Sequence, residues 1–120
     1  MSTKEIGDWG EKIALDYFTK REYTFVKKGF RSRFGEIDLI VKNKDFLVFV
    51  EVKVRKDSSF AQAREFVSKN KQRKIRTTAQ LWLSRAETGL QPRFDVLEIY
   101  APEGSATKEP EIIHIDNAFQ

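Results

Sequence analysis

The chain has 120 residues, of which 40% are hydrophobic and 33% are charged, and its net charge is +4. This length predicts one domain, 1–120, with a single core and the composition of an ordinary globular protein. Because cysteine is absent and His114 is the only histidine, disulfides, thiolate zinc sites, cysteine nucleophiles and mechanisms that need two imidazoles are excluded. With no apolar run near the ~20 residues that cross a bilayer, and no apolar leader, we expect a cytoplasmic protein without a membrane partner.

The positive charge is concentrated in the middle of the chain. Residues 20–85 carry a net charge of +11, whereas residues 1–19 carry −2 and residues 86–120 carry −5. The densest part is residues 69–76, which hold five cations and no acid. Such a cluster suits a polyanion, because each cation that displaces a phosphate counterion adds affinity. A solvated helix face explains the pattern equally well, so charge indicates nucleic acid without deciding for it.

Hydrophobic periodicity and turn residues predict an α/β domain in the order α-β-β-β-α-β-β. The expected elements are a helix over 4–20, strands over 23–28, 35–42 and 46–54, a helix over 68–85, and strands over 93–100 and 112–115. The short connection 43–45 predicts an antiparallel hairpin, and residues 29–34 are expected to form a loop. Gly7 and Gly10 in the first helix predict a close approach to another element. The acidic part 101–120 is a candidate flexible segment and docking surface.

Charged residues stand inside strands that are otherwise apolar. Asp38 interrupts the strand over 35–42, while Glu51 and Lys53 share one face of the strand over 46–54. Burying an unpaired carboxylate is costly, so both acids need partners. One interpretation is a structural ion pair with Lys53. The other is a divalent-metal site, in which two carboxylates offer hard oxygen ligands to Mg²⁺ and Lys53 orients a water or neutralises a phosphate.

Two helical residues border these strands. Glu11 lies at the edge of the apolar stripe of the first helix, where a solvated acid is the alternative interpretation. Lys71 lies on the inner face of the second helix, near its N-terminus, where a cation opposes the helix dipole. We expect a phosphate or a carboxylate of the site to compensate Lys71, unless it only snorkels at the sheet edge. Gln72 is a weaker candidate for the same role.

Further cations are candidates for contacts with backbone phosphates, which position nucleic acid without reading its sequence. They are Arg31, Arg33, Arg55, Arg73, Lys74 and Arg76.

Two motifs in the strands that carry Asp38 and Glu51 resemble those of a known family. GEIDLI at 35–40 followed by FVEVKVR at 49–55 resembles the PD-(D/E)XK nuclease core, in which an Asp and a Glu-x-Lys triplet hold the metal. Nearly the full chain is similar to the bacterial YraN-like family of uncharacterised, nuclease-like proteins. That similarity includes Gly10-Glu11, Phe60, Lys71 and Arg93-Phe94-Asp95-Val96. A Glu-x-Lys triplet alone is weak, whereas both motifs together with the upstream Gly-Glu are specific.

The resemblance implies a restriction-endonuclease-like fold, with a central mixed sheet flanked by helices, similar to archaeal Holliday-junction resolvases. It implies that Asp38, Glu51 and the carbonyl of Val52 hold the metal. Lys53 would act at the attacking water, and Glu11 would be the third, helix-borne acid of the metal and catalytic set.

These features together predict a Mg²⁺- or Mn²⁺-dependent endonuclease-like protein that binds DNA and hydrolyses phosphodiesters, on branched or otherwise structured substrates. One alternative is a nucleic-acid binding module on the same fold with no cleavage. Another is a subunit that acts only with a protein partner, docked through residues 101–120. A symmetric homodimer is compatible with one site per chain, because cutting two strands needs two sites.

Overall fold

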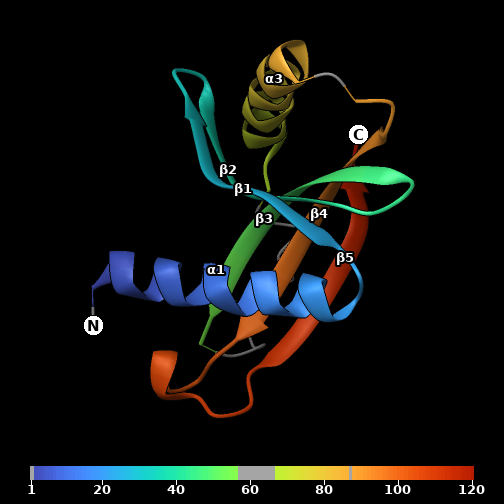
Figure 1. Cartoon of the computed structure of the whole chain (residues 1–120). Helices are drawn as coiled ribbons and strands as arrows, with labels where there is room; N and C mark the ends of the chain where they lie inside the picture. Colours follow the sequence, from blue (N-terminus) through green and yellow to red (C-terminus); the bar gives the residue numbers. More distant parts are fainter. Residues whose placement is uncertain (1, 57–66, 87) are drawn as a thin grey trace.

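The chain is built around one five-stranded sheet in the spatial order β1-β2-β3-β4-β5 (Figure 1). The computed structural model describes residues 2–56, 67–86 and 88–120. The elements in chain order are α1 (Thr3–Lys20), β1 (Thr24–Ser32), β2 (Gly35–Lys42), β3 (Phe46–Arg55), α3 (Lys69–Arg85), β4 (Gln91–Tyr100), the short 3₁₀ helix η1 (Gly104–Ala106) and β5 (Glu111–Phe119). Phe60, which carries part of the family resemblance, lies outside the described residues.

The sheet is mixed, as the sequence predicts. β3 and β4 pair in parallel, whereas the other neighbouring strands are antiparallel. The observed order α-β-β-β-α-β-β confirms the expected fold class and is consistent with a restriction-endonuclease-like core. The hairpin between β2 and β3 is also confirmed. The Asn43 side chain closes it by accepting hydrogen bonds from the backbone N–H groups of Asp45 and Phe46.

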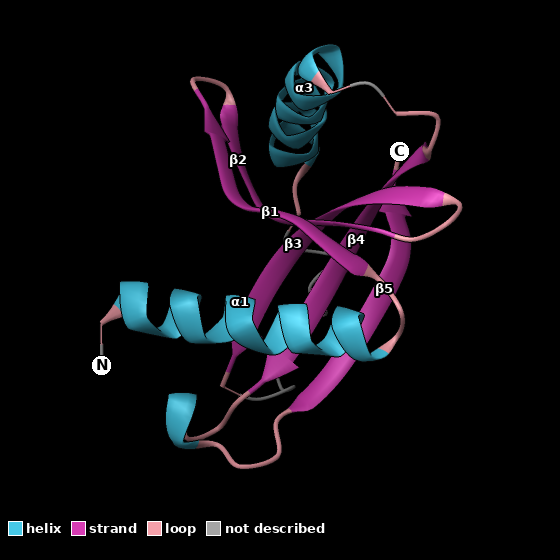
Figure 2. Ribbon diagram, in the orientation of Figure 1, coloured by secondary structure: helices cyan, strands magenta, loops and turns pink. Residues whose placement is uncertain are grey.

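The two helices cover opposite faces of the sheet (Figure 2). On α1, Ala14 and Phe18 are fully buried against a cluster that includes Val48 and Val50 of β3. On α3, Ile75 and Ala79 pack against a second cluster that includes Phe49. Because neighbouring positions of a strand point to opposite faces, the apolar run at the start of β3 serves both cores.

Two segments are more regular than the sequence suggested. β1 runs to Ser32, so the loop expected over 29–34 is wrong and only a tight turn remains between β1 and β2. Tertiary packing explains the difference, because Phe30 pairs with Ile37 across the strands and its ring meets Trp82 of α3, with centroids 5.1 Å apart. β5 spans Glu111–Phe119 rather than 112–115, since it pairs with β4 along most of its length.

Gly10 allows α1 to lie directly on β3. A Cβ atom at Gly10 would lie 2.6 Å from a methyl carbon of Val54 and 3.7 Å from one of Val52. The close approach predicted from sequence is therefore confirmed at Gly10. It is wrong for Gly7, where a Cβ atom would meet no atom within 4 Å. The next residue, Glu11, is held against the sheet as a consequence.

Substitution of these two glycines separates the packing effect from helix propensity. Gly10→Ala is expected to lower the free energy of unfolding by up to about 2 kcal/mol, because overpacking costs about 1–3 kcal/mol and helix propensity returns only about 1 kcal/mol. Gly7→Ala, with open space around it, is expected to be neutral or to stabilise by up to about 1 kcal/mol. Urea unfolding of both variants measures this, and an equal gain in both would contradict the close approach.

Candidate functional site

The strands β2 and β3 separate in the middle of the sheet. They pair from Lys42 and Leu47 up to Leu39 and Val50. Beyond that pair, β2 continues with β1 as far as Gly35, while β3 continues with β4 as far as Arg55. Figure 2 shows the β1–β2 hairpin leaving the rest of the sheet and leaning toward α3.

Asp38 and Glu51 are the first residues after the separation. Ile37 and Ile40 join the same core cluster although they are three residues apart, so the alternation of β2 is interrupted at Asp38. On β1, Gly29 lies between the residues that pair with Leu39 and Ile37 and has a φ of +59°, in the left-handed region that favours glycine. We use the name fork site for Asp38, Glu51, Val52 and Lys53 together with Lys71 of α3.

Asp38 replaces a backbone partner that β3 has lost. Its Oδ2 accepts a hydrogen bond from the backbone N–H of Val52 at 2.8 Å. Because the N–H and C=O of one strand residue point to the same edge, the Val52 carbonyl faces the same gap. Burial and the negative charge of Glu51 raise the pKa of Asp38 to about 7, although the Val52 hydrogen bond lowers it.

Glu51 is buried and neutralised by two lysines. Its Oε1 lies 3.3 Å from the Nζ of Lys53 and 2.5 Å from the Nζ of Lys71. Burial and the adjacent Lys71 lower the pKa of Lys53. Burial also acts to lower the pKa of Lys71, but the contact of its Nζ with Glu51 outweighs burial and raises that pKa. The structure therefore contains the expected ion pair of Glu51 with Lys53.

Lys71 reaches Glu51 because of where α3 begins. Ser68 is the N-cap, and its side chain accepts a hydrogen bond from the Lys71 N–H at 3.1 Å. The first turn of α3 then points Lys71 at the open end of β3. The sequence predicts that a phosphate or a carboxylate of the site compensates this cation, and Glu51 is that carboxylate.

Two further acids border the fork site. Glu11 on α1 is half-buried, and burial raises its pKa although the nearby Lys28 lowers it. Both Glu11 and Glu36 of β2 help to raise the pKa of Asp38. Within residues 2–56, 67–86 and 88–120, however, no three His, Asp or Glu side chains gather closely enough to hold a metal ion. The close oxygen donors are thus Asp38, Glu51 and the Val52 carbonyl, and direct ligation by Glu11 stays a prediction.

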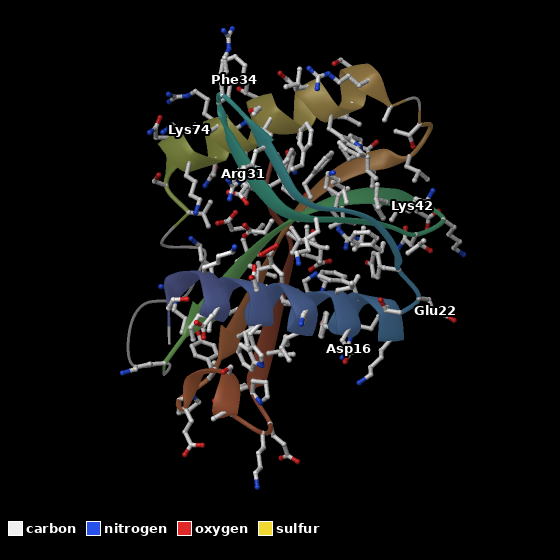
Figure 3. All side chains as sticks on the ribbon, turned by 60° about the vertical axis from the view of Figure 1, so that its left-hand side comes forward. Asp16, Glu22, Arg31, Phe34, Lys42 and Lys74 are labelled. Carbon is white, nitrogen blue, oxygen red and sulfur yellow. The ribbon has the colours of Figure 1, made fainter. Side chains whose placement is uncertain are left out.

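The expected nucleic-acid contacts fall into two groups. On the side of the β1–β2 hairpin, Arg31 and Arg33 are exposed, and Lys71 and Lys74 line a cleft of about 280 Å³ against Gly35. Figure 3 shows Arg31 on the hairpin and Lys74 on α3.

The other candidates lie elsewhere or hold backbone groups. Gln72 donates to the carbonyl of Val67 at 2.9 Å and Arg76 to that of Gln120 at 2.7 Å. Arg73 is exposed, and Arg55 is half-buried at the end of β3. Their contacts with nucleic acid stay predictions.

Another polar cluster lies on the α1 face of the sheet. Asp95 of β4 is fully buried and accepts hydrogen bonds from Arg93 at 2.8 Å and from the Asn117 N–H at 3.0 Å, with His114 Nε2 at 2.7 Å. His114 also meets the hydroxyl of Tyr17 on α1. Burial alone would raise the pKa of Asp95, but these hydrogen bonds lower it. The cluster ties α1, β4 and β5 together, which gives the only histidine a structural role.

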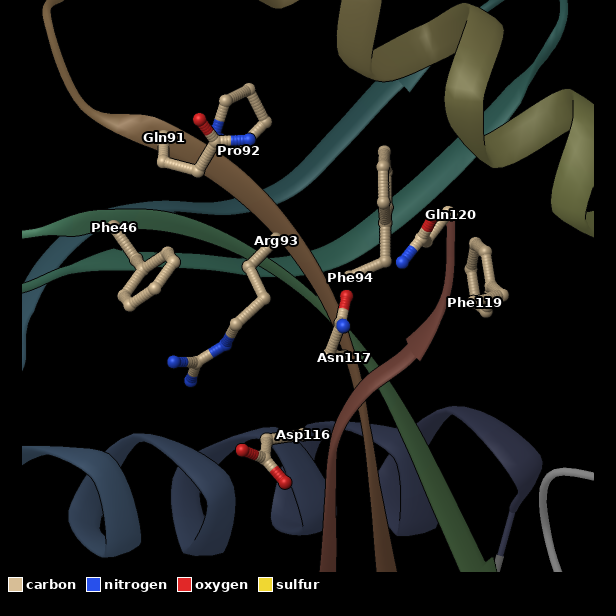
Figure 4. Close-up of a pocket in the computed structure, with 9 residues that line it drawn as sticks. All are labelled: Phe46, Gln91, Pro92, Arg93, Phe94, Asp116, Asn117, Phe119 and Gln120. Atoms are coloured by element: carbon tan, nitrogen blue, oxygen red, sulfur yellow. The ribbon is translucent and has the colours of Figure 1, made fainter.

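A cleft of about 620 Å³ opens beside this cluster, at the start of β4 and the end of β5 (Figure 4). Its lining includes Phe46, Arg93, Phe94 and Asn117 but no residue of the fork site. The Arg93 guanidinium lies 4.8 Å from the Phe46 ring centroid and is committed to Asp95. The larger cleft and the fork-site carboxylates therefore lie in different parts of the described structure.

The fold and the site thus define an α/β protein with one buried carboxylate, one partly buried carboxylate and two lysines where two strands separate. A family model with the description "Uncharacterised protein family UPF0102" matches residues 10–99, which include the whole fork site. The chain belongs to the UPF0102 family. This membership confirms the expected relation to an uncharacterised bacterial family, while the nuclease activity stays a prediction.

Similar proteins cover the chain from end to end. It is 41% identical over 120 residues to a UPF0102 protein of Caldanaerobacter subterraneus subsp. tengcongensis, covering 99% of this chain and 98% of that protein. It is 39% identical over 120 residues to a UPF0102 protein of Clostridioides difficile, covering 99% and 100%. For a UPF0102 protein of Thermodesulfovibrio yellowstonii, the identity is 37% over 119 residues and the coverage 99% of each. Among the described residues, no helix is long and apolar enough to span a membrane.

The titration of Asp38 predicts how stability depends on pH. Its folded pKa of about 7 stands above the ordinary 3.8, so between these values the folded chain binds more protons and wild-type stability falls as pH rises. Asp38→Asn removes this loss and is expected to be more stable than wild type at pH 8 by about 1 kcal/mol or more. The difference should vanish toward pH 4.

Urea unfolding at pH 4, 6 and 8 measures this difference. Asp45→Asn, in the exposed β2–β3 turn, is the matched control and should follow the wild-type curve. A wild-type stability that does not fall between pH 4 and pH 8 relative to Asp38→Asn would contradict the burial of the Asp38 charge.

Proposed function

We propose that the fork site holds a divalent cation, Mg²⁺ or Mn²⁺, and hydrolyses phosphodiester bonds of DNA. The observation that carries this proposal is the convergence of Asp38 and Glu51 at the strand separation, with Lys53 and Lys71 on the same carboxylate. The pattern GEIDLI and FVEVKVR, which resembles the PD-(D/E)XK core, supports the same chemistry.

The donors at the fork site suit a hard cation. Asp38 and Glu51 offer carboxylate oxygens and Val52 offers a backbone carbonyl, and Mg²⁺ takes few protein ligands because it keeps several waters. A bound ion would lower the pKa of a coordinated water and stabilise the charge that develops on the phosphate. Glu51 would exchange its lysine partners for the ion.

The lysines would then turn to the substrate. Lys53 is mostly buried between Glu51 and Lys71, in a position to hold the attacking water. The side chain of Lys71 is 40% exposed at the mouth of the fork site, where it can contact a phosphate oxygen. Glu11 would orient water at the α1 side. The Arg31, Arg33 and Lys74 side chains would position the DNA backbone without reading sequence.

A second candidate function rests on the ion pairs themselves. Glu51 is already paired with Lys53 and Lys71, so the charge of this carboxylate is compensated without a metal. This favours a nucleic-acid binding module, or a subunit that becomes active only with a partner. In either case the basic residues of the hairpin and of α3 would still bind DNA.

Cleavage assays test the first proposal. Plasmid, linear duplex, single-stranded and four-way-junction DNA are incubated with wild type and with Asp38→Ala or Glu51→Ala, in Mg²⁺, Mn²⁺ or EDTA. We expect metal-dependent cutting that falls at least ~100-fold in both variants, since each removes a charge that acts on the transition state. Asp45→Ala, which removes an exposed acid on the β2–β3 turn, serves as control and should cut like wild type.

A thermal melt with and without Mn²⁺ separates the alternatives. A cation held by the fork site raises the melting temperature of wild type and not of Asp38→Ala, because only the folded site binds it. DNA binding that is sensitive to salt but indifferent to Mn²⁺ and to Asp38→Ala, with no cutting, would refute the metal-dependent enzyme and leave the binding module.

A further inference from the structure

The tip of the β1–β2 hairpin is fixed to α3. The Ser32 hydroxyl lies 3.0 Å from the Thr78 hydroxyl of α3 and accepts a hydrogen bond from the Phe34 N–H at 3.0 Å. Gly35 fits against α3 so closely that a Cβ atom there would lie 3.3 Å from the Cβ of Lys74. The turn between β1 and β2 is therefore held in place by its contacts with α3.

This rigid tip carries an aromatic side chain that the core does not use. The Phe34 side chain is 41% exposed at the far end of the hairpin (Figure 3). The Arg33 guanidinium lies 4.8 Å from its ring centroid, a cation–π contact that leaves part of the ring open to solvent. The other large apolar residues exposed to this degree in the described part of the chain are Phe25 and Ile113, which lie away from the tip.

The charges around Phe34 select its partner. Arg33 lies over the Phe34 ring, Arg31 is exposed further along β1, and Lys74 of α3 lies against Gly35. The one acid at the tip, Glu36, already pairs with Arg31 at 3.3 Å. A partner that offers flat rings together with regular negative charge is a nucleic acid, because bases stack on aromatic side chains while their phosphates meet cations.

The distance from the tip to the fork site matches a short stretch of DNA. Phe34 precedes Asp38 by four residues along β2, which corresponds to about 13 Å at about 3.3 Å per residue. A strand with a phosphate at Asp38 would therefore bring a base about four steps away to the Phe34 ring, at about 3.4 Å per step.

We infer that Phe34 stacks on an exposed base face, so that the protein takes DNA whose base stack is interrupted by a gap or a single-stranded segment in preference to continuous duplex. The inference rests on the proposed function for its nucleic-acid partner. It adds a substrate feature and a contact residue that the fork site does not supply. In continuous duplex both faces of each base are covered by neighbours, and stacking on Phe34 would require unstacking them.

Binding in EDTA, where no cutting occurs, tests this inference on the full chain. The probes are a gapped duplex with 2-aminopurine beside the gap and the matching continuous duplex, followed by fluorescence and anisotropy. Wild type is expected to bind the gapped DNA at least ~5-fold more tightly and to change the 2-aminopurine signal. Phe34→Ala should weaken gapped binding about 5- to 100-fold, as loss of base–aromatic stacking does, and remove the preference.

Two further variants control the measurement. Phe34→Trp keeps an aromatic ring and should retain the preference for gapped DNA. Phe25→Ala removes an equally exposed ring at the other end of β1 and should bind like wild type.

The outcomes separate this inference from the proposed function. A Phe34→Ala variant with wild-type affinity and preference would overturn the stacking role while leaving the nuclease proposal standing. Absence of any DNA binding by wild type would overturn both. If Phe34→Ala loses binding to gapped DNA and wild type does not cut DNA with Mg²⁺ or Mn²⁺, the stacking role is upheld and the proposed hydrolysis is refuted.

Discussion

The separation of β2 from β3 after the Leu39–Val50 pair controls the arrangement of the rest of the molecule. A strand that leaves its neighbour inside a protein exposes backbone groups that must find other partners. The Asp38 carboxylate accepts the Val52 N–H and so takes the place of the missing ladder contact. The Asp38 side chain thus satisfies the backbone N–H of Val52 and also places a carboxylate in the gap between β2 and β3. A long uninterrupted β2–β3 pairing would have left Asp38 and Glu51 simple cross-strand neighbours.

The fork site gathers charge at a cost in stability. Asp38 and Glu51 repel one another in a desolvated place, which is why the pKa of Asp38 rises. Lys53 and Lys71 offset the charge of Glu51, yet they also lie close enough for Lys71 to lower the pKa of Lys53. Strand positions of this kind are usually apolar in natural proteins. Acids with perturbed pKa values cluster at functional sites, where proteins accept the cost of bringing like charges together. The Asp95 cluster differs, since its hydrogen bonds lower the pKa of the acid that they surround.

In each helix, one local structural feature brings a charged group to the sheet. On α1, the missing side chain of Gly10 lets the helix rest on Val54 and holds Glu11 at the border of the fork site. On α3, the Ser68 cap sets the start of the helix, which aims Lys71 at Glu51. The two apolar clusters keep the helices on opposite faces, so these contributions reach the gap from both sides of the sheet.

Local patterns in the sequence were sufficient to predict the helices, most of the strands and part of the fork site. Period-two alternation and the short 43–45 turn place Asp38 on the strand next to Glu51 and Lys53, because a hairpin turn determines which residues face each other. The Ser68 cap and the inner face of α3 follow from helical spacing. Glycine and two arginines, in contrast, made residues 29–34 look like a loop, although packing of Phe30 on Trp82 holds them as strand and turn.

Contacts between distant parts of the chain were decided only by the tertiary structure. No periodicity relates Lys71 to Glu51 or Tyr17 to His114, because these pairs form where a helix packs on the sheet. The contact of His114 with Asp95 depends on the pairing of β4 with β5. The interruption of β2 at Asp38 likewise depends on the hairpin leaning toward α3 and being fastened there by Ser32 and Thr78. By itself, the sequence determined which side chains share a face of the helices and of β3, since that depends on regular backbone geometry alone. Which of them meet across the fold depends on how the two cores pack.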